Sequence, residues 1–433
     1  MKVEDLARQV KQASLQLSAC SAELKNSALA QIARSLAEGK ETIFSANQTD
    51  LQRSEQENLA APLLKRLKFD EAKLQTAIAG IESLIGLEDP VGKTLQATEL
   101  DQDLELYRVT CPIGVIGVIF ESRPDALVQI AALCLKSGNG VILKGGTEAR
   151  ETNRVLAEII RQATAAAGIP ENWLQLLESR SEVNELLKLD EFIDLIIPRG
   201  SNEFVRYIME HSRIPVMGHA DGICHCYVAA DADPELAVKI VVDSKTQYVA
   251  VCNALETLLV HDGVAPRFWE ILKKEMNLKQ VELIGCPATQ KRIPVTPATE
   301  ADWSTEYLDH KLSIKVVGSL DEAINHINTY GSGHTDSIVT KDPKQAARFM
   351  ALVDSGNVFW NCSTRFSDGF RYGLGAEVGI STAKIHARGP VGLEGLVIYK
   401  YQLIGNGQIV ADYASHSKTF THRLLNKEFP LNR

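Results

Sequence analysis

Hydrophobic positions recur at a helical spacing in the first part of the chain. Up to about residue 87, apolar residues return every three or four positions, as Leu29, Ile32 and Leu36 do. That spacing gathers them on one face of a helix. The pattern therefore predicts a set of amphipathic helices over residues 1–87, and none of these helices carries chemistry by itself.

After residue 113 the pattern changes to short apolar runs separated by helical stretches. The runs cover residues 114–120, 140–144, 173–177 and 195–197. Strands that alternate with helices in this way form a parallel sheet with helices on both faces. Ligands of such sheets bind beyond the carboxyl ends of the strands. We therefore expect a binding site at the turns 121–124, 144–147 and 198–201.

A second alternation follows residue 252 and predicts a second α/β unit with its own core. Its strands are expected near residues 255–260, 281–284, 314–317, 338–339 and 357–360. Two polar, glycine-rich stretches, 331–336 and 361–375, hang from these strand ends and are typical of binding loops. The dinucleotide fingerprint G-x-G-x-x-G follows none of the strands, so the pattern favours a phosphate-bearing ligand without a standard Rossmann site.

Residues 104–110 and 396–404 alternate between apolar and polar positions, as half-exposed strands do. We expect these two distant segments to be counterparts outside the core. They are either dimer-forming strands or private hairpins, and the pattern does not separate these alternatives. Beyond Ala411 the chain is basic and polar, which predicts a loosely packed surface tail.

The composition narrows the class of protein. The chain has 433 residues, of which 45% are hydrophobic and 23% charged, and its net charge is −9. An acidic chain is a poor partner for nucleic acid or an anionic membrane. The first residues lack the apolar core of a signal peptide, and every apolar run is shorter than the ~18 residues of a membrane span. We expect a cytoplasmic protein.

Eight cysteines are scattered without CxxC spacing, so neither a disulfide framework nor a zinc ribbon is indicated. The one cluster is Cys224, His225 and Cys226. In a strand, alternate residues face opposite sides, so His225 would point away from both thiols. We interpret these cysteines as structural and expect no metal cofactor.

Cys252 lies at the junction of a predicted helix, about 234–243, and the predicted strand 255–260. There a thiol can face a cleft while both flanking elements hold it still. A thiolate is a strong nucleophile and forms covalent acyl intermediates. The local sequence fits a catalytic nucleophile, and it also fits a buried small hydrophobe, which is what most cysteines are.

Several longer stretches share a family pattern in the right order. They are 112–117 (PIGVIG), 194–200 (DLIIPRG), 252–257 (CNALET), 317–338 and 375–389. Together they resemble the γ-glutamyl phosphate reductases, or glutamate-5-semialdehyde dehydrogenases, of the aldehyde dehydrogenase superfamily. The resemblance runs from about residue 100 to 410, and more weakly over the N-terminal helices.

The resemblance implies an aldehyde-dehydrogenase-like α/β fold with two parallel-sheet domains and a small β-flap for oligomerisation. The cofactor-binding domain would cover residues 1–230, with a flap strand at about 100–111. The catalytic domain would cover 231–370. Residues 371–433 would return to the cofactor domain and supply a second flap strand, about 395–405, and the C-terminal tail.

The resemblance also implies a reaction. It is the NADPH-dependent reduction of L-glutamyl 5-phosphate to L-glutamate 5-semialdehyde with release of phosphate, the second step of proline biosynthesis from glutamate. Cys252 would form a thioester, which hydride from the nicotinamide would reduce. The resemblance implies a homo-oligomer and leaves open whether the enzyme associates with glutamate 5-kinase, the upstream enzyme.

The resemblance assigns roles to individual residues. For catalysis these are Cys252, Asn253 as a backbone oxyanion donor, and Ser122, which stands where the superfamily has an asparagine. For the cofactor they are Lys144, Gly145, Gly146, Thr147, Gly200, Ser201 and Asp309, the last aligned near the acid that contacts the nicotinamide ribose. For the substrate they are Arg123, Thr364, Arg365 and Arg388, although each arginine fits a surface or structural ion pair equally well.

Two exchanges relative to the superfamily bear on specificity. Relatives that favour NAD carry a glutamate at the position of Thr147. Without that carboxylate nothing repels a 2′-phosphate, and Lys144 can pair with it, which favours NADPH. In hydrolytic relatives a glutamate at the position of His219 activates water. A histidine can also act as a general base, so this exchange alone does not exclude hydrolysis. His326 and His334 are expected to be structural.

Three rival functions fit parts of the sequence. A hydrolytic aldehyde dehydrogenase would use the same fold. A non-enzymatic scaffold would keep the fold without the reaction, but the intact Cys252 and the phosphate-type loops argue against it. A thiol acyltransferase without a redox cofactor would leave the loop after Lys144 unexplained.

Overall fold

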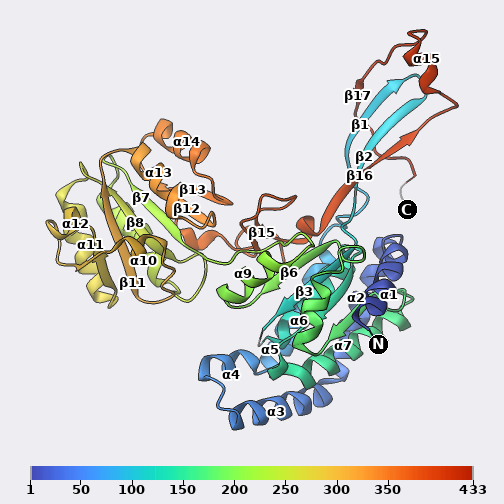
Figure 1. The fold of residues 1–433 in the computed structure, drawn as a ribbon, viewed down its shortest axis with the longest axis horizontal. Helices are drawn as coiled ribbons and strands as arrows, with labels where there is room; N and C mark the ends of the chain where they lie inside the picture. Colours follow the sequence, from blue (N-terminus) through green and yellow to red (C-terminus); the bar gives the residue numbers. More distant parts are fainter. Residues whose placement is uncertain (1, 122, 432–433) are drawn as a thin grey trace.

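The structure of the protein, a computed structural model, describes residues 2–121 and 123–431, except for the side chains of Pro62 and Arg180. Figure 1 shows two α/β lobes side by side and a narrow sheet that projects from the first lobe. We call these parts the first lobe, the second lobe and the arm. In the described part of the chain, no helix combines the length and apolar character that crossing a membrane requires.

The predicted N-terminal helices are present and pack onto the first lobe (Figure 1). They are α1 (Val3–Leu17), α2 (Ala22–Glu38), α3 (Lys40–Gln56), α4 (Ala61–Leu67) and α5 (Glu71–Gly86). Ser21 begins α2 as an N-cap whose side chain accepts a hydrogen bond from the Leu24 N–H. The predicted stripe of Leu29, Ile32 and Leu36 is fully buried.

The first lobe contains a four-stranded parallel sheet in the order β5-β4-β3-β6. Its strands are β3 (Val115–Phe120), β4 (Gly140–Lys144), β5 (Leu174–Leu177) and β6 (Leu195–Arg199), all close to the predicted runs. The connecting helices are α6 (Pro124–Lys136), α7 (Arg150–Ala166), preceded by the turn η1 (Thr147–Ala149), α8 (Arg180–Leu186) and, after β6, α9 (Asn202–His211). Alternate strand residues, such as Val118 and Ile119, enter separate cores on the two faces.

The second lobe is built on a seven-stranded parallel sheet in the order β10-β9-β11-β8-β7-β12-β13. Its strands are β7 (Cys224–Val228), β8 (Leu255–His261), β9 (Glu282–Gly285), β10 (Thr296–Pro297), β11 (Lys311–Val317), β12 (Thr335–Val339) and β13 (Asn357–Trp360). Its helices are α10 (Pro234–Thr246), α11 (Pro266–Leu278), α12 (Pro287–Gln290), α13 (Leu320–Tyr330) and α14 (Pro343–Leu352), with the short turns η2 (Glu300–Ser304) and η3 (Thr364–Phe366). The second predicted α/β unit is therefore present.

The arm is an antiparallel sheet in the order β16-β2-β1-β17. Its strands are β1 (Thr94–Asp101), β2 (Leu104–Pro112), β16 (Val397–Ile404) and β17 (Arg423–Leu425), and between the last two lies α15 (Val410–Ala414). The predicted counterparts do pair, with Tyr107 opposite Gln402. The predicted strand at about 100–111 differs in its start, because a turn at Asp103, with a left-handed φ of 58°, separates β1 from β2.

The predicted tail beyond Ala411 is mostly exposed on the surface, as expected, but part of it is packed in a defined way. β17 pairs with β1, and Phe429 is buried with its ring edge-to-face against Tyr107 at a centroid distance of 5.3 Å. Apolar burial and strand pairing outweigh the polar composition of this segment. Between the lobes and the arm, the chain forms the small ribbon β14 (Gly379–Ser381) with β15 (Gly389–Val391) and the turn η4 (Leu393–Leu396).

Candidate active site

Cys252 lies in the turn between α10 and β8, as the sequence predicted, and its side chain is half-buried. The backbone of this turn is in close contact with Gly222. A Cβ atom on Gly222 would collide with the carbonyl oxygen of Cys252 and would lie 2.6 Å from its carbonyl carbon. The segment at Gly222 therefore presses directly against the backbone of Cys252 and fixes where the thiol points.

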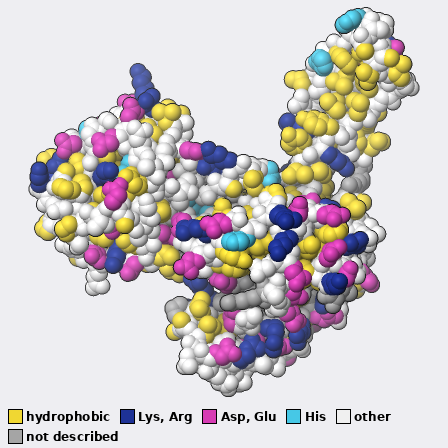
Figure 2. Space-filling model, viewed as in Figure 1, with side chains coloured by type: hydrophobic (Ala, Val, Ile, Leu, Met, Phe, Trp, Pro, Cys, Tyr) yellow, Lys and Arg dark blue, Asp and Glu magenta, His cyan; other side chains and the backbone are white. Residues whose placement is uncertain are grey.

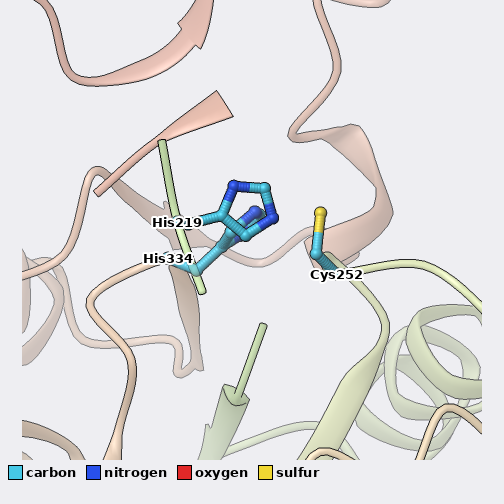
Figure 3. Close-up of side chains that lie close together, drawn as sticks. All are labelled: His219, Cys252 and His334. Atoms are coloured by element: carbon cyan, nitrogen blue, oxygen red, sulfur yellow. The ribbon is translucent and has the colours of Figure 1, made fainter. Parts of the chain in front are cut away.

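Two histidines converge on the Cys252 thiol (Figure 3). One ring nitrogen of His219, one of His334 and the Cys252 sulfur all lie within 4.8 Å of one another. His219 Nδ1 lies 2.9 Å from the carbonyl oxygen of Ile380. A carbonyl only accepts hydrogen bonds, so Nδ1 carries the proton, and in the neutral ring Nε2 is left with a lone pair. The structure thus places a basic nitrogen beside the thiol.

A network of hydrogen bonds holds the turn from the other side. The Asn253 side chain donates to the carbonyl of Ser367 at 2.6 Å, and the Thr364 hydroxyl donates to the carbonyl of Asn253 at 2.8 Å. Thr364 is fully buried, so its hydroxyl supports the turn. Among the described residues, no acceptor takes the backbone N–H of Cys252 or Asn253. These two amides are therefore available to an oxyanion.

Two arginines interact electrostatically with the Cys252 sulfur, one from each lobe. Arg365 is buried and donates from Nε to Gln247 at 2.9 Å. Arg199, at the end of β6, has a buried Nη1 atom with no hydrogen-bond partner in the described part of the chain. Burial lowers the pKa of both guanidinium groups. A buried guanidinium nitrogen without a partner is costly unless an anion binds it.

The other two predicted arginines differ in their surroundings. Arg388 is engaged by protein groups: it donates to the Asp354 side chain and main chain, each at 3.0 Å, and to the Thr382 carbonyl at 3.3 Å. This ion pair ties two loops together, so the geometry favours a structural role. Arg123 is exposed and lies near enough to Arg199 to repel it.

A buried ion pair lies beside the turn that carries Cys252. Lys245 Nζ donates to Glu256 Oε2 at 2.6 Å, and both side chains have no exposed surface. Burial raises the pKa of the Glu256 carboxyl to about 7, although Lys245 opposes the shift. Burial likewise lowers the pKa of Lys245. Because the pair joins the end of α10 to β8, it spans the turn that carries Cys252.

A small pocket lies at the carboxyl ends of β4 and β5. Gly145, Gly146, Arg150, Asn153, Leu176, Leu177 and Glu178 line it. A Cβ atom on Gly145 would collide with the Asn153 side chain. The Asn153 side chain occupies the space that a side chain at position 145 would need, so only glycine fits there without a rearrangement. Thr147 beside it is exposed, and Lys144 is buried.

The turn at Gly200 and Ser201 lies at the boundary of the lobes, and the predicted acid Asp309 lies in the second lobe between η2 and β11. Glu121 accepts a hydrogen bond from the Ser201 N–H at 3.1 Å. Asn202 next to it donates to Glu306 across the boundary at 2.5 Å. Asp309 is exposed, and its carboxylate accepts from the His310 N–H. Ser122 lies outside the described residues.

Four residues that the sequence did not single out belong to this site. His334 was expected to be structural, yet it lies beside Cys252. Glu377 interacts electrostatically with Arg199 and accepts from the Gly369 N–H at 2.7 Å, and burial raises the pKa of its carboxyl. Arg199 and Gly222 complete the set. The signal for Arg199 was its place at the end of a predicted strand, whereas contacts between distant segments define the other three.

Known proteins resemble the chain over its whole length. Residues 1–311 match the model of the aldehyde dehydrogenase family. A γ-glutamyl phosphate reductase from Acetivibrio thermocellus is 71% identical over 431 residues, 100% of both chains. The crystal structure of a γ-glutamyl phosphate reductase from Thermotoga maritima has a TM-score of 0.92 at 38% identity, covering 94% of this chain and 100% of that one.

A more distant protein shares the fold. A glyceraldehyde-3-phosphate dehydrogenase from Methanocaldococcus jannaschii, whose structure is complexed with NADP, has a TM-score of 0.63 at 15% identity. The alignment covers 93% of this chain and 94% of that one. These likenesses confirm the α/β fold expected from the sequence.

Proposed function

Because the chain belongs to the γ-glutamyl phosphate reductases of the aldehyde dehydrogenase family, we propose that it reduces L-glutamyl 5-phosphate to L-glutamate 5-semialdehyde with Cys252 as nucleophile and NADPH as hydride donor. Phosphate is released, and the product serves proline biosynthesis. The observation that carries the proposal is the setting of Cys252, a half-buried thiol with histidines beside it and an arginine nearby from each lobe.

The first step uses groups of this chain alone. His219 Nε2 accepts the proton of the Cys252 thiol, and the thiolate attacks the acyl carbon of the substrate. The backbone amides of Cys252 and Asn253 donate to the oxyanion, where the loss of one donor typically costs about 3 kcal/mol. The carbon–oxygen bond to the phosphate then breaks, which leaves a γ-glutamyl thioester on Cys252.

The arginines suit the two anionic ends of the substrate. The phosphate is bonded to the reacting acyl group, and the α-carboxylate lies at the far end of the glutamyl chain. Arg199 is assigned to the phosphate, because its Nη1 has no partner among the described residues and Arg123 lies nearby. Arg365, held in place by Gln247, is assigned to the carboxylate. Guanidinium groups match both anions through paired hydrogen bonds.

The turn at Gly145 and Gly146, at the carboxyl end of β4, would contact the cofactor, which supplies the hydride that reduces the thioester. Glu377 and Asp309 are the candidate acids for its ribose at the boundary between the lobes. Thr147 carries no charge, and Lys144, whose ammonium group donates to the Gly145 carbonyl, adds a positive charge to this turn, which supports NADPH over NADH. A protein of the same fold is complexed with NADP.

We assign the enzyme to the cytoplasm as a homo-oligomer. The support for association lies in the arm, where large apolar side chains are exposed along β16 and β17 (Figure 2). Tyr399, Tyr401, Leu403 and Leu424 are between 50% and 70% exposed. A patch of this kind on a soluble protein is typical of an interface.

The reverse reaction tests the proposal against the hydrolytic alternative. With glutamate 5-semialdehyde and NADP⁺, the steady rate should depend on inorganic phosphate and saturate with it, because phosphate must resolve the thioester. Without phosphate or arsenate, at most one turnover per Cys252 is expected. Sustained formation of free glutamate in phosphate-free buffer would replace this proposal with a hydrolytic aldehyde dehydrogenase. Absence of any NADP⁺ reduction would favour the scaffold.

A further inference from the structure

Three metal-binding side chains meet at one point of the active site. The ligand atoms of His219, Cys252 and His334 come from three separate segments, the loop after α9, the turn before β8 and the loop before β12. Figure 3 shows the two rings and the thiol gathered together. We propose that Zn²⁺, or a divalent cation of similar softness, binds these three side chains and reversibly blocks the nucleophile. One thiolate and two imidazoles form a donor set that zinc prefers.

His219 is already oriented as a metal ligand. Its Nδ1–H donates to the Ile380 carbonyl at 2.9 Å. Metal-binding histidines usually donate their second ring N–H to a carbonyl or carboxylate, which fixes the ring and raises the basicity of the ligating nitrogen. Its Nε2 is thus the coordinating atom, and no tautomer change is needed before a cation binds.

His334 gives an independent reason to expect a ligand. Its side chain has no exposed surface, and Nδ1 lies 2.8 Å from the Thr335 hydroxyl and 3.8 Å from the Cys224 sulfur. Its Nε2, in contrast, is buried without a hydrogen-bond partner among the described residues. An unsatisfied buried polar atom typically costs about 1–3 kcal/mol. A metal bound to Nε2 would give this buried nitrogen the partner that the described residues do not provide.

The spacing fits an occasional ligand better than a permanent structural metal. Zinc bonds of about 2.0–2.3 Å hold tetrahedral ligand atoms roughly 3.5 Å apart. These atoms lie within 4.8 Å of one another, so a movement of at most about 1 Å brings them to that spacing. The half-buried Cys252 side chain can make this adjustment by rotation. Three protein ligands leave the fourth position to water. Arg199 and Arg365 lie near the sulfur and oppose a cation, which keeps binding reversible.

Binding involves no redox change. The Cys252 S–H bond breaks, its proton goes to solvent, and a zinc–sulfur bond forms while the two imidazoles remain neutral. The bound thiolate can no longer attack an acyl carbon. The metal is therefore an inhibitor that protects the thiol, and it is distinct from a cofactor.

Cobalt titration of the reduced full-length protein tests the site without relying on its enzymatic activity. Co²⁺ should produce a thiolate-to-cobalt charge-transfer band that saturates at one ion per chain and that Zn²⁺ displaces. Cys252→Ser should abolish the band. His219→Ala should raise the dissociation constant at least about 100-fold, since loss of even a supporting residue costs 10- to 100-fold. Slower alkylation of Cys252 by iodoacetamide in the presence of Zn²⁺ should accompany binding.

Two controls make the result decisive. His386→Ala changes an exposed histidine outside the cluster and should leave the band unchanged. His334→Ala should weaken binding as His219→Ala does, and an unchanged thermal unfolding midpoint would show that the loss is local. A charge-transfer band that survives Cys252→Ser, or that is insensitive to both histidine changes, would overturn the proposal. So would the absence of a band at stoichiometric cobalt.

Discussion

Gly222 lies so close to the main chain of Cys252 that no side chain fits between them. The contact joins the loop that carries His219 to the turn that carries Cys252, the proposed nucleophile. Glycine is used here for its lack of volume, because its φ angle is one that any residue can adopt. The position of the thiol thus depends on the lack of a Cβ atom at Gly222, thirty positions away in the sequence.

Gly222→Ala should reduce kcat strongly while leaving the protein folded. The added methyl group must push the Cys252 turn away, and a displacement of about 1 Å at a reacting group can cost about 100-fold in rate. Steady-state kinetics and the rate of Cys252 alkylation would measure the effect. Gly379→Ala is the matched control, because a Cβ there meets nothing within 4 Å. Equal activity of the two variants would contradict the tight contact.

Lys245→Met should destabilise the protein by about 3–5 kcal/mol, since it leaves the Glu256 carboxyl buried and unpaired. The double variant Lys245→Met/Glu256→Leu should recover most of that loss, because two apolar side chains need no partner. Urea unfolding of the single and double variants would measure the coupling. If the two single losses simply add, the side chains do not act as a pair.

The same pair predicts how stability depends on pH. The folded pKa of Glu256 is raised to about 7, above the ordinary value of 4.5. Between these values the folded state keeps a proton that the unfolded state releases, so the contribution of Glu256 is greatest below pH 4.5 and falls as pH rises to 7. Relative to Glu256→Gln, the wild-type free energy of unfolding should fall by on the order of 3 kcal/mol across this window. A pH-independent difference would refute the shift.

Thr147→Glu should shift the cofactor preference from NADPH towards NADH. A carboxylate at this exposed position would repel a 2′-phosphate and could accept hydrogen bonds from ribose hydroxyls. The ratio of kcat/KM for the two cofactors is the measurement. Thr329→Glu adds the same charge on an exposed face of α13 in the second lobe and should leave the ratio unchanged. If both variants behave alike, the turn does not recognise the 2′-phosphate.

Arg199→Gln should raise the KM for phosphate in the reverse reaction by about 10- to 100-fold, the loss expected for a charge-assisted hydrogen bond worth about 1.5–3 kcal/mol. The KM for NADP⁺ should change little. Arg206→Gln removes an exposed arginine that pairs with Asp221 and serves as the control. A lower kcat with an unchanged KM for phosphate would assign Arg199 to the chemical step instead.

The sheets were predictable because buried parallel strands leave continuous apolar runs. The position of Cys252 was predictable because it follows a helix pattern and precedes such a run. β17 was missed, since three residues that alternate weakly carry almost no periodic signal. Its pairing with β1 is decided by tertiary contacts, among them the packing of Phe429 on Tyr107.

The site was predictable to the extent that its residues follow strand ends. Arg388 illustrates the limit, because its residue type fits an anion site while Asp354 in fact binds it. His334 illustrates the opposite case, in which a residue expected to be structural lies beside the nucleophile. Neither outcome follows from local sequence, since each depends on which distant loop packs alongside.

The make-up of the arm sets an order for its assembly. The ion pair between Glu99 and Arg423 joins residues 324 positions apart. The backbone N–H of Phe429 donates a hydrogen bond to the Thr94 hydroxyl, 335 positions away. On the ribosome, β1 and β2 are therefore complete long before β16 and β17 emerge, by which time the first lobe can already have folded. Until then the hairpin exposes unpaired strand edges, which are prone to stray pairing. The arm is thus the last of these sheets to close, and any subunit association that uses it must wait until β16 and β17 have emerged.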